Sequence, residues 1–452
     1  MTASPRDDFH DEMAASLTHN RITRRQALWL LGAGSSAVAL QGCAYSPVTG
    51  EPILVGMSEA QERSTDTQLA PHQFSQDLGE VQDPALNRYV SDVGNRLARR
   101  SHRPTMPYSY RTLNANYVNA YTFPGGAMGL TRGIVSDLDN EAELAALLGH
   151  EIAHVNARHA AQRQGQGLLL QVASAGLNIA ASGTQWSTLA GLGSAIGSSA
   201  LLANYSRENE READALGQEY MVRAGYPANG MVSLHQKLLA EEKSQPNLLA
   251  TLFSTHPMSR ERVANAQSLA NGRYAVSRGA SPGRERFMDQ TASLRRLKPT
   301  IDACKQGETA MAKKNLTAAH SAFQTALART PQDYAANVRM AHCLQAQGRA
   351  SQAKRFIDTA QRINPREAYA QKVGATLALA LRDPGSAYAQ LDRYDRLLPG
   401  DPGVLFLKGV SAEGMGDRQR AANHYASYLR RTQSGDAAQF AYQRLQRMGM
   451  VR

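Results

Sequence analysis

Cysteine is scarce in this sequence. Only three occur among 452 residues, at positions 43, 304 and 343. Three cysteines cannot form the disulfide framework that stabilises small secreted domains. The chain is also too long for one core of usual size, so two or three domains are expected.

The apolar run near the N-terminus is too short to span a membrane as a helix. It extends from Ala27 to Leu40, follows Arg24 and Arg25, and ends in small residues before Cys43. A basic start, a short apolar run and a small-residue end are typical of a signal peptide, here residues 1–42. The paired arginines resemble a twin-arginine export signal, and ordinary secretion is the alternative.

The segment from Leu40 to Cys43 resembles the lipobox of bacterial lipoproteins. The resemblance implies that Cys43 is lipidated and becomes the first mature residue, followed by a tether over 43–60. Several acyl chains anchor a protein stably, because each buried CH₂ contributes about 0.8 kcal/mol. Ala44 stands where an aspartate would retain the protein at the inner membrane. We therefore expect a periplasmic protein anchored to the outer membrane.

Acidic residues are fewer than basic residues, and most of this difference lies in the C-terminal third of the chain. Residues 300–452 hold 22 Lys or Arg against 12 Asp or Glu, whereas the whole chain has a net charge of +11. A basic field attracts acidic peptides or anionic lipids, but an arginine-rich solvated helix surface explains it as well. Export makes nucleic acid an unexpected partner.

Charged residues and histidine are absent from residues 164–206. A hairpin that touches the membrane or gates substrate is one interpretation. The many Gly, Ser, Gln and Asn residues of this segment argue against a stable span. Apolar helices that pack on the core are the preferred interpretation.

A small sheet and several helices are expected after residue 100. Aromatic and β-branched residues predict strands over 108–113, 117–122 and 128–135, with a turn at 123–126. Asp139 and Asn140 then precede a helix whose apolar residues recur every three or four positions. Further helices are predicted over 206–224 and 229–243.

The predicted helix after Asn140 carries the pentapeptide HEIAH. His150 and His154 lie one turn apart on nearly the same face, which allows two imidazoles to bind one Zn²⁺. Glu151 is placed to hold an attacking water and take its proton. HExxH also arises by chance on charged helices, so a third ligand has to be found.

The next predicted helix supplies that ligand. Glu210 leaves a fourth position open for water, as a catalytic zinc requires, and Asp214 can accept the outer N–H of a ligand histidine. Glu208 and Glu212 are interpreted as surface charges. The extended HExxHxxGxxH motif is absent, because positions 157 and 160 are alanine. His159 is expected to point about 140° away from His154 if the helix continues.

A repeat follows residues 272–299, which are predicted to be a linker. Pro331, Pro365 and Pro399 are 34 residues apart, the period of tetratricopeptide repeats. Small and aromatic residues such as Gly307 and Phe323 recur at the expected positions. About four repeats are predicted over 300–452, with a capping helix over 437–447.

Cys304 and Cys343 fall on first helices of neighbouring repeats. A disulfide between them is one interpretation, and two small buried core residues is the preferred one.

The segments HEIAH, EREAD (210–214) and Thr255-His256-Pro257 resemble, in order and spacing, the gluzincin family of CAAX prenyl endoproteases and the heat-shock protease HtpX. With repeats after it, the chain is similar to the β-barrel assembly-enhancing (BepA-like) branch. The likeness covers about 46–270 for the protease and 300–450 for the repeats.

The resemblance implies one Zn²⁺ held by His150, His154 and Glu210. Glu151 would then be general base and acid, with Asp214 supporting a ligand. His256 matches a family histidine that stabilises the oxyanion or, in a closed site, occupies the open metal position. Arg262 matches a basic residue of the family whose role the sequence leaves open. Spanning helices are not evident, which makes prenylated substrates unexpected.

The sequence therefore predicts an α+β, mainly helical zincin-type metalloprotease over 61–271 with a small sheet, followed by an all-α tetratricopeptide solenoid. Its expected function is a zinc endopeptidase that degrades misfolded or misassembled exported proteins. The repeats would recruit substrate or the outer-membrane protein assembly machinery. The alternatives are a chaperone or scaffold that acts through its repeats and carries a latent metal site, and a peptidase with incidental repeats.

Overall fold

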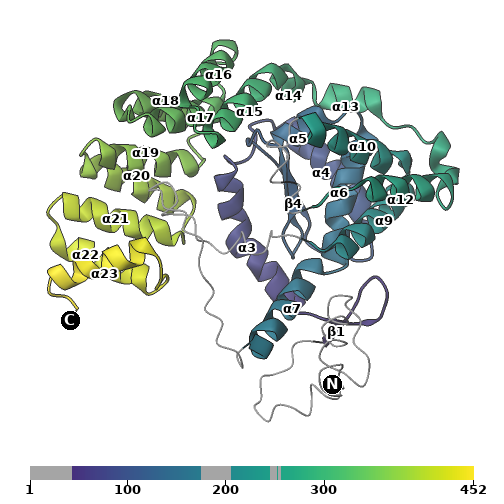
Figure 1. The fold of residues 1–452 in the computed structure, drawn as a ribbon, viewed down its shortest axis with the longest axis horizontal. Helices are drawn as coiled ribbons and strands as arrows, with labels where there is room; N and C mark the ends of the chain where they lie inside the picture. Colours follow the sequence, from purple (N-terminus) through teal and green to yellow (C-terminus); the bar gives the residue numbers. More distant parts are fainter. Residues whose placement is uncertain (1–42, 175–204, 245–251, 253–255, 452) are drawn as a thin grey trace, which may run out of the picture.

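The computed structural model describes residues 43–174, 205–244, 252 and 256–451 (Figure 1). The signal peptide predicted over 1–42 and most of the uncharged segment lie outside these residues. The described chain is a mostly helical domain with two small sheets, followed by a helical solenoid. The predicted fold class is confirmed.

Residues 43–60, predicted to be a tether, form a hairpin and the start of a helix. Strand β1 (Cys43–Tyr45) pairs antiparallel with β2 (Pro52–Leu54). The Gly56 N–H donates to the carbonyl of Ala161 at the start of α7 (His159–Ser174). Burial of apolar residues against that helix favours the folded form. Cys43 itself is exposed.

Helix α3 (Glu59–Gln76) begins at a capping box formed by Ser58 and Gln61. Helix α4 (Pro84–Ala98) begins at Asp83, whose side chain accepts two backbone N–H groups. In Figure 1, α3 lies between the sheet and the solenoid. Asp66 of α3 accepts the backbone N–H of Ala127 at the start of β5, and Ser75 donates to Glu367 of the solenoid, so α3 contacts both parts.

The central sheet has the order β3-β5-β4. Strands β3 (Ser109–Leu113) and β5 (Ala127–Thr131) are parallel, whereas β4 (Ala120–Thr122) pairs antiparallel with β5. The predicted strand over 128–135 is wrong at its end. The Thr131 side chain accepts the Ile134 N–H and starts helix α5 (Arg132–Asp137), so this cap overrides the β-branched residues that follow.

Two helices cross closely beside this sheet. Helix α6 (Glu141–Asn156) is capped by Asn140, and α9 (Arg207–Arg223) is capped by Ser206, as their sequences predict. A Cβ on Gly217 would lie 2.8 Å from the His150 backbone nitrogen, and one on Gly149 would lie 3.0 Å from the Gly217 carbonyl oxygen. Two glycines thus let the backbones touch where both motifs lie.

The helices α10 (Asn229–Ser244) and α12 (Arg260–Asn271) complete the wall around α6 and α9. The residues predicted to be a linker continue this wall. They form η1 (Ala275–Gly279), α13 (Arg284–Gln290) and α14 (Ala292–Arg296), with Phe287 and Leu294 in the core of the first domain. Apolar burial, which the Gly, Ser and Pro content masks, fixes this segment as part of the fold.

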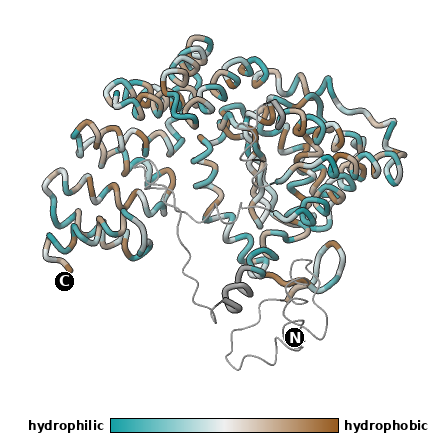
Figure 2. Tube along the Cα trace, viewed as in Figure 1, coloured by the Kyte–Doolittle hydropathy of each residue, from teal (hydrophilic) through white to brown (hydrophobic). Residues whose placement is uncertain are grey.

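Antiparallel helix pairs form the solenoid, as the repeat period predicts. The helices are α15 (Lys298–Ala312), α16 (Leu316–Arg329), α17 (Tyr334–Ala346), α18 (Ala350–Ile363), α19 (Tyr369–Ala380), α20 (Pro384–Leu397), α21 (Pro402–Gly414), α22 (Arg418–Leu429) and the capping helix α23 (Asp436–Arg447). Hydrophobic and hydrophilic residues alternate along each of them (Figure 2). Their apolar faces meet between neighbours.

The same glycine–aromatic contact occurs within the first repeat and within the fourth repeat. A Cβ on Gly307 would overlap the Phe323 ring, and one on Gly409 would overlap the Tyr425 ring. The glycine lets the aromatic ring of the second helix pack on the backbone of the first. Cys304 and Cys343 are both free and buried, as preferred from the sequence.

The solenoid packs on the first domain through polar and apolar contacts. Arg132 donates to both carboxylate oxygens of Asp333, at 2.7 and 3.0 Å, and both side chains are buried. Leu78, just after the end of α3, belongs to the apolar core of the repeats. Glu367 accepts a hydrogen bond from Ser75 on α3. In the described parts of the chain, no helix is long and apolar enough to cross a membrane.

Candidate metal centre

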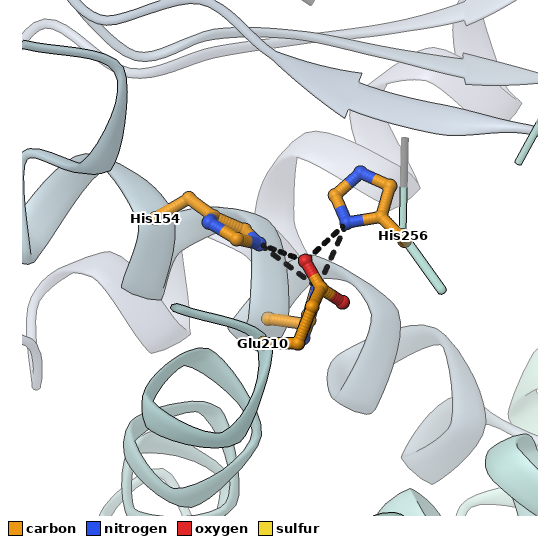
Figure 3. A group of neighbouring side chains, drawn as sticks. His154, Glu210 and His256 are labelled. Atoms are coloured by element: carbon orange, nitrogen blue, oxygen red, sulfur yellow. Dashed lines mark hydrogen bonds and ion pairs between the residues drawn. The ribbon is translucent and has the colours of Figure 1, made fainter. Parts of the chain in front are cut away.

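Four buried side chains converge where α6 and α9 cross. His150 and His154 come from α6, Glu210 from the first turn of α9, and His256 from the residues before α12. One ligand atom of each lies within 4.8 Å of the others. Figure 3 shows His154 and His256 directed at the Glu210 carboxylate. The sequence predicted this grouping from three separate segments, HEIAH, EREAD and Thr255-His256-Pro257, the last of them through the family resemblance.

The spacing of these atoms fits a zinc ion. Ligands of a tetrahedral Zn²⁺ at about 2.0 Å stand about 3.3 Å from one another. The two histidine Nε2 atoms are 3.0 Å apart, and the shorter distances from each to the Glu210 oxygens are 3.5 and 3.3 Å. Two imidazoles and one carboxylate are also the ligand set of catalytic zinc sites. The residues present therefore fit zinc.

Burial and partners prepare these groups to act as ligands. Burial lowers the pKa of His154 well below its usual value, so its imidazole is neutral. Burial alone would raise the pKa of Glu210, but His256, His150 and hydrogen bonds from His154 and His256 hold it well below the usual range. A neutral imidazole and an ionised carboxylate are the forms that bind metal.

Asp214 lies where the sequence predicted it. Its carboxylate is 3.0 Å from the Nδ1 atom of His150, which leaves Nε2 directed toward Glu210. Burial raises the pKa of Asp214, but His235, Arg262 and a hydrogen bond from His150 outweigh it and keep the carboxyl ionised. This contact fixes the tautomer of the first histidine.

Arg262 has a role in the structure that the sequence left open. Its guanidinium donates to both oxygens of Asp214 at 2.7 Å and lies 2.7 Å from Glu210. The side chain is buried. One cation on α12 therefore holds both carboxylates of α9 in position and compensates their charge.

Glu151 stands beside the group without joining it. One of its oxygens is 3.8 Å from Nε2 of His256, and the other is buried without a hydrogen-bond partner among the described residues. Burial raises the pKa of this carboxyl, and the nearby histidines reduce the effect. A buried carboxylate with a free oxygen is suited to accept a proton from a water molecule.

His256 occupies the fourth corner of the group. Its Nδ1 atom is 3.0 Å from Glu210 and 3.3 Å from Nε2 of His150. Of the two roles that the family resemblance implied, this position matches the closed one, in which the histidine takes the place of water. An oxyanion-stabilising role requires a different position of the ring. The roles of all seven predicted residues of this site remain predictions.

The interpretation of His159 as facing away is wrong. Helix α6 ends at Asn156, and Arg158 adopts a φ of +58°, so the chain turns before α7 begins. The Nδ1 atom of His159 lies 2.8 Å from Nδ1 of His154, and its Nε2 lies 3.2 Å from Glu212. Glu212 is therefore more than a solvated charge, whereas exposed Glu208 pairs with Arg211 as expected.

Two other residues escaped the sequence analysis. His235 on α10 lies 3.2 Å from Asp214. The Tyr205 ring stacks on His154 with a centroid separation of 3.9 Å. Neither belongs to a motif, because their positions depend on how distant helices pack. The single signal was that each lies in or next to a predicted helix of the site.

An HExxH helix crossed by a helix that carries a candidate third ligand is the arrangement of a zincin-type metalloprotease domain. Residues 84–270 match the model of peptidase family M48, and residues 310–377 match a tetratricopeptide repeat model. The chain thus contains an M48 peptidase domain followed by tetratricopeptide repeats. Both assignments confirm the resemblance stated from the motifs.

Relatives with assigned names match the protease domain. The chain is 31% identical over 196 residues to the beta-barrel assembly-enhancing protease of Yersinia pestis, and 30% identical over 198 residues to that of Escherichia coli strain K12. Each match covers 42% of this chain and 40% of the relative. The mitochondrial metalloendopeptidase OMA1 of Schizosaccharomyces pombe is 31% identical over 179 residues, 39% of this chain and 50% of that protein.

Solved structures resemble the chain weakly. A tetratricopeptide protein of Thermus thermophilus aligns with 40% of this chain and 94% of its own, at 20% identity and a TM-score of 0.29. A likeness of this size carries no argument. The repeats are identified by their sequence and by their paired helices.

Proposed function

We propose that this chain is a zinc-dependent endopeptidase. The observation that carries the proposal is the buried group of His150, His154 and Glu210 with Glu151 beside it. A metal site with a purely structural role has no need of a buried carboxylate that has a free oxygen. Relatives of the protease domain are named as a protease and a metalloendopeptidase, which supports the same reaction class.

The residues divide the reaction between them. His150, His154 and Glu210 would hold zinc, which when bound supplies a Lewis acid that polarises the peptide carbonyl. Glu151 accepts the proton of the attacking water and returns it to the leaving amine. Asp214 and Arg262 keep His150 and Glu210 oriented. Exclusion of bulk water from this buried group strengthens each of these interactions.

His256 makes the resting state of the proposed enzyme a closed one. A catalytic zinc keeps one position for water, and Nδ1 of His256 lies in the corner that the water would use. The ring has to leave before a peptide is cut. This placement also favours the second candidate function, a repeat-driven chaperone or scaffold in which the metal site stays latent.

Strand β4 is suited to an extended substrate. It forms one edge of the sheet, and the residues that follow it, Phe123 and Pro124, line a small cavity together with His154 and Tyr205. An edge strand binds polypeptide through backbone hydrogen bonds, which favours unfolded over folded substrates. We propose misfolded or misassembled envelope proteins as this class.

The remaining elements set the proposed place of action. Lipidated Cys43 would tie the protein to a membrane facing the periplasm, and the export route is twin-arginine or general secretory. The repeats would recruit substrate or machinery for outer-membrane protein assembly. The names of the relatives, beta-barrel assembly-enhancing proteases, support this setting.

The proposal is tested by cleavage of casein with residues 44–452 at matched zinc content. Wild type is expected to cut, and Glu151→Gln is expected to lose at least about 100-fold in rate, the usual contribution of a general base. His256→Ala is expected to cut faster than wild type. Equal cleavage by wild type and Glu151→Gln contradicts the role of Glu151. Failure of both wild type and His256→Ala to cut favours the chaperone.

A further inference from the structure

The two histidines of HEIAH are supported in different ways on their outer nitrogens. His150 contacts the Asp214 carboxylate directly, at 3.0 Å. The corresponding nitrogen of His154 contacts another histidine, His159, at 2.8 Å. Glu212 lies on the far side of His159, 3.2 Å from its Nε2 atom. A chain of hydrogen bonds thus runs from His154 through His159 to Glu212 on the surface of α9.

Binding of zinc to Nε2 of His154 would fix the protons along this hydrogen-bond chain. Nε2 of His154 faces Glu210 and has to carry a lone pair to bind metal, so its proton sits on Nδ1. Nδ1 of His154 then donates to Nδ1 of His159, which must be the unprotonated nitrogen of that ring. The His159 proton is consequently on Nε2 and is donated to Glu212. Every donor in this hydrogen-bond chain then meets one acceptor.

The local fold holds His159 in this position. The chain turns after α6 ends at Asn156, and the left-handed Arg158 brings the first residue of α7 back over the HEIAH helix. Arg158 is anchored by a hydrogen bond to buried Glu62 at 2.7 Å. The His159 side chain is completely buried, whereas that of Glu212 is 39% exposed. The hydrogen-bond chain therefore consists of the buried His159 ring and the partly exposed Glu212 carboxylate.

This support is weaker than that of His150. Asp214 is buried and compensated by Arg262 and His235, so it cannot turn away. Glu212 has solvent on one side, and its single described partner is His159. Stacking of Tyr205 on the ring restrains the plane of His154 but does not choose which nitrogen carries the proton. The choice of tautomer at His154 falls to His159.

We propose that His159 and Glu212 are positioning residues for His154, which hold the proton on Nδ1 and present Nε2 to the metal. The proposal rests on the proposed zinc site. It assigns a function to the histidine five residues after HEIAH and to the middle acid of the EREAD segment. Loss of such a hydrogen-bond partner typically lowers metal affinity about 10- to 100-fold.

The test measures zinc affinity of residues 44–452 by competition with a chromogenic chelator, with Zn²⁺ as the probe. His159→Leu keeps most of the volume but removes the acceptor, whereas His159→Asn keeps an acceptor near the position of Nδ1 in a smaller side chain. We expect His159→Leu to bind zinc about 10- to 100-fold more weakly than wild type, and His159→Asn to recover part of that loss. A packing role predicts the reverse order.

Glu212→Gln and Glu208→Gln form a matched pair on α9. Each variant removes one negative charge, and the two positions are four residues apart on the same helix. Glu212 contacts His159, whereas Glu208 pairs with Arg211. We expect a loss of a few-fold for Glu212→Gln, no change for Glu208→Gln, and non-additive losses in His159→Leu/Glu212→Gln. Thermal unfolding of each metal-free variant checks that the fold is kept.

Two results overturn the proposal. One is wild-type zinc affinity in folded His159→Leu, and the other is equal effects of the two glutamate variants. Failure of wild type itself to bind zinc overturns the proposed zinc site, and the positioning role with it. Tight binding by wild type and His159→Leu alike overturns the positioning role alone.

Discussion

Two buried clusters of charge in this chain are built in different ways. At the junction between the domains, Arg132 uses its guanidinium to bind Asp333 and the Asn116 side chain, and each donor group has an acceptor. Around His150 and His154, ligand atoms of the same kind crowd together, and Glu151 has an oxygen without a partner among the described residues. The first arrangement pairs each donor group with an acceptor, whereas the second gathers atoms of the kind that bind a metal ion.

The comparison shows that buried charge alone does not mark an active site. Each cluster contains a carboxyl group whose pKa is shifted, Asp333 in one and Glu210 in the other. Burial raises the pKa of Asp333, but Arg132 and backbone N–H groups hold it below its usual value, as the histidines do for Glu210. What separates the clusters is their composition: one cation faces one anion at the junction, whereas three histidines and one carboxylate bring four possible metal-binding atoms together at the candidate metal centre.

Glu210→Gln should have the largest effect. An amide oxygen is a poor replacement for a carboxylate ligand of zinc, so zinc affinity should fall by more than the roughly 10- to 100-fold typical of losing a partner of a ligand. Casein cleavage should be lost with it. Asp333→Asn is the control from the other cluster, and its zinc affinity should equal that of wild type. A similar fall in both variants would erase the distinction between the clusters.

Arg132→Met should destabilise the fold without changing zinc affinity. It leaves Asp333 buried without its cation, which typically costs about 3–5 kcal/mol. The free energy of unfolding in urea measures the loss. Arg132→Met/Asp333→Leu removes both charges and should recover much of it. No recovery would mean that Arg132 acts through packing and not through its charge.

Asp333 also predicts a pH dependence of stability. Its pKa in the folded chain lies below the unfolded value of 3.8, so its contribution is present above that value and is lost as the pH falls through the lower, folded pKa. The free energy of unfolding of Asp333→Asn should depend less on pH in this acidic range. Equal slopes for variant and wild type would contradict an ionised Asp333.

Arg262→Met should weaken zinc binding by about 10- to 100-fold. Without the guanidinium, Asp214 and Glu210 repel each other and lose three short contacts. Chelator competition measures the change. Arg211→Met is a suitable control, because Arg211 is next to Glu210 on α9 but is exposed and pairs with Glu261. A metal affinity unchanged in Arg262→Met would remove this residue from the site.

Gly307→Ala should have the smallest effect. The new methyl group would meet the Phe323 ring, which costs about 1–3 kcal/mol, partly offset by about 1 kcal/mol of helix propensity. Gly409→Ala, at the equivalent position against Tyr425, should change the free energy of unfolding by a similar amount. Clearly unequal losses would show that the repeats are not equivalent there.

The sequence predicted the parts of the site that lie within single helices. The spacing of HEIAH and of Glu210 and Asp214 follows from helical periodicity, and Asn140 and Ser206 start their helices where expected. The repeat period predicted the solenoid for the same reason, since each unit contacts its neighbours in sequence. Local periodicity can be recognised in a sequence without knowledge of the tertiary packing.

Other features depended on contacts between distant residues. His159 was misjudged because the end of α6 at Asn156 has no strong signal, and the roles of Arg262 and His235 require α10 and α12 to be in place. Residues 43–60 and 272–299 fold through apolar contacts with other elements. Thr131 ended β5 early through a cap. Tertiary contact or local capping overrode composition in each of these cases.

The most direct test of the central claim is the position of zinc in crystals of residues 44–452. Anomalous diffraction recorded at the zinc absorption edge should give one strong peak per chain, in contact with Nε2 of His150, Nε2 of His154 and the Glu210 carboxylate, and none beside Arg132 and Asp333. Absence of a peak at His150 and His154 in zinc-loaded protein, or a peak only elsewhere, would contradict the assignment of this cluster as a metal centre.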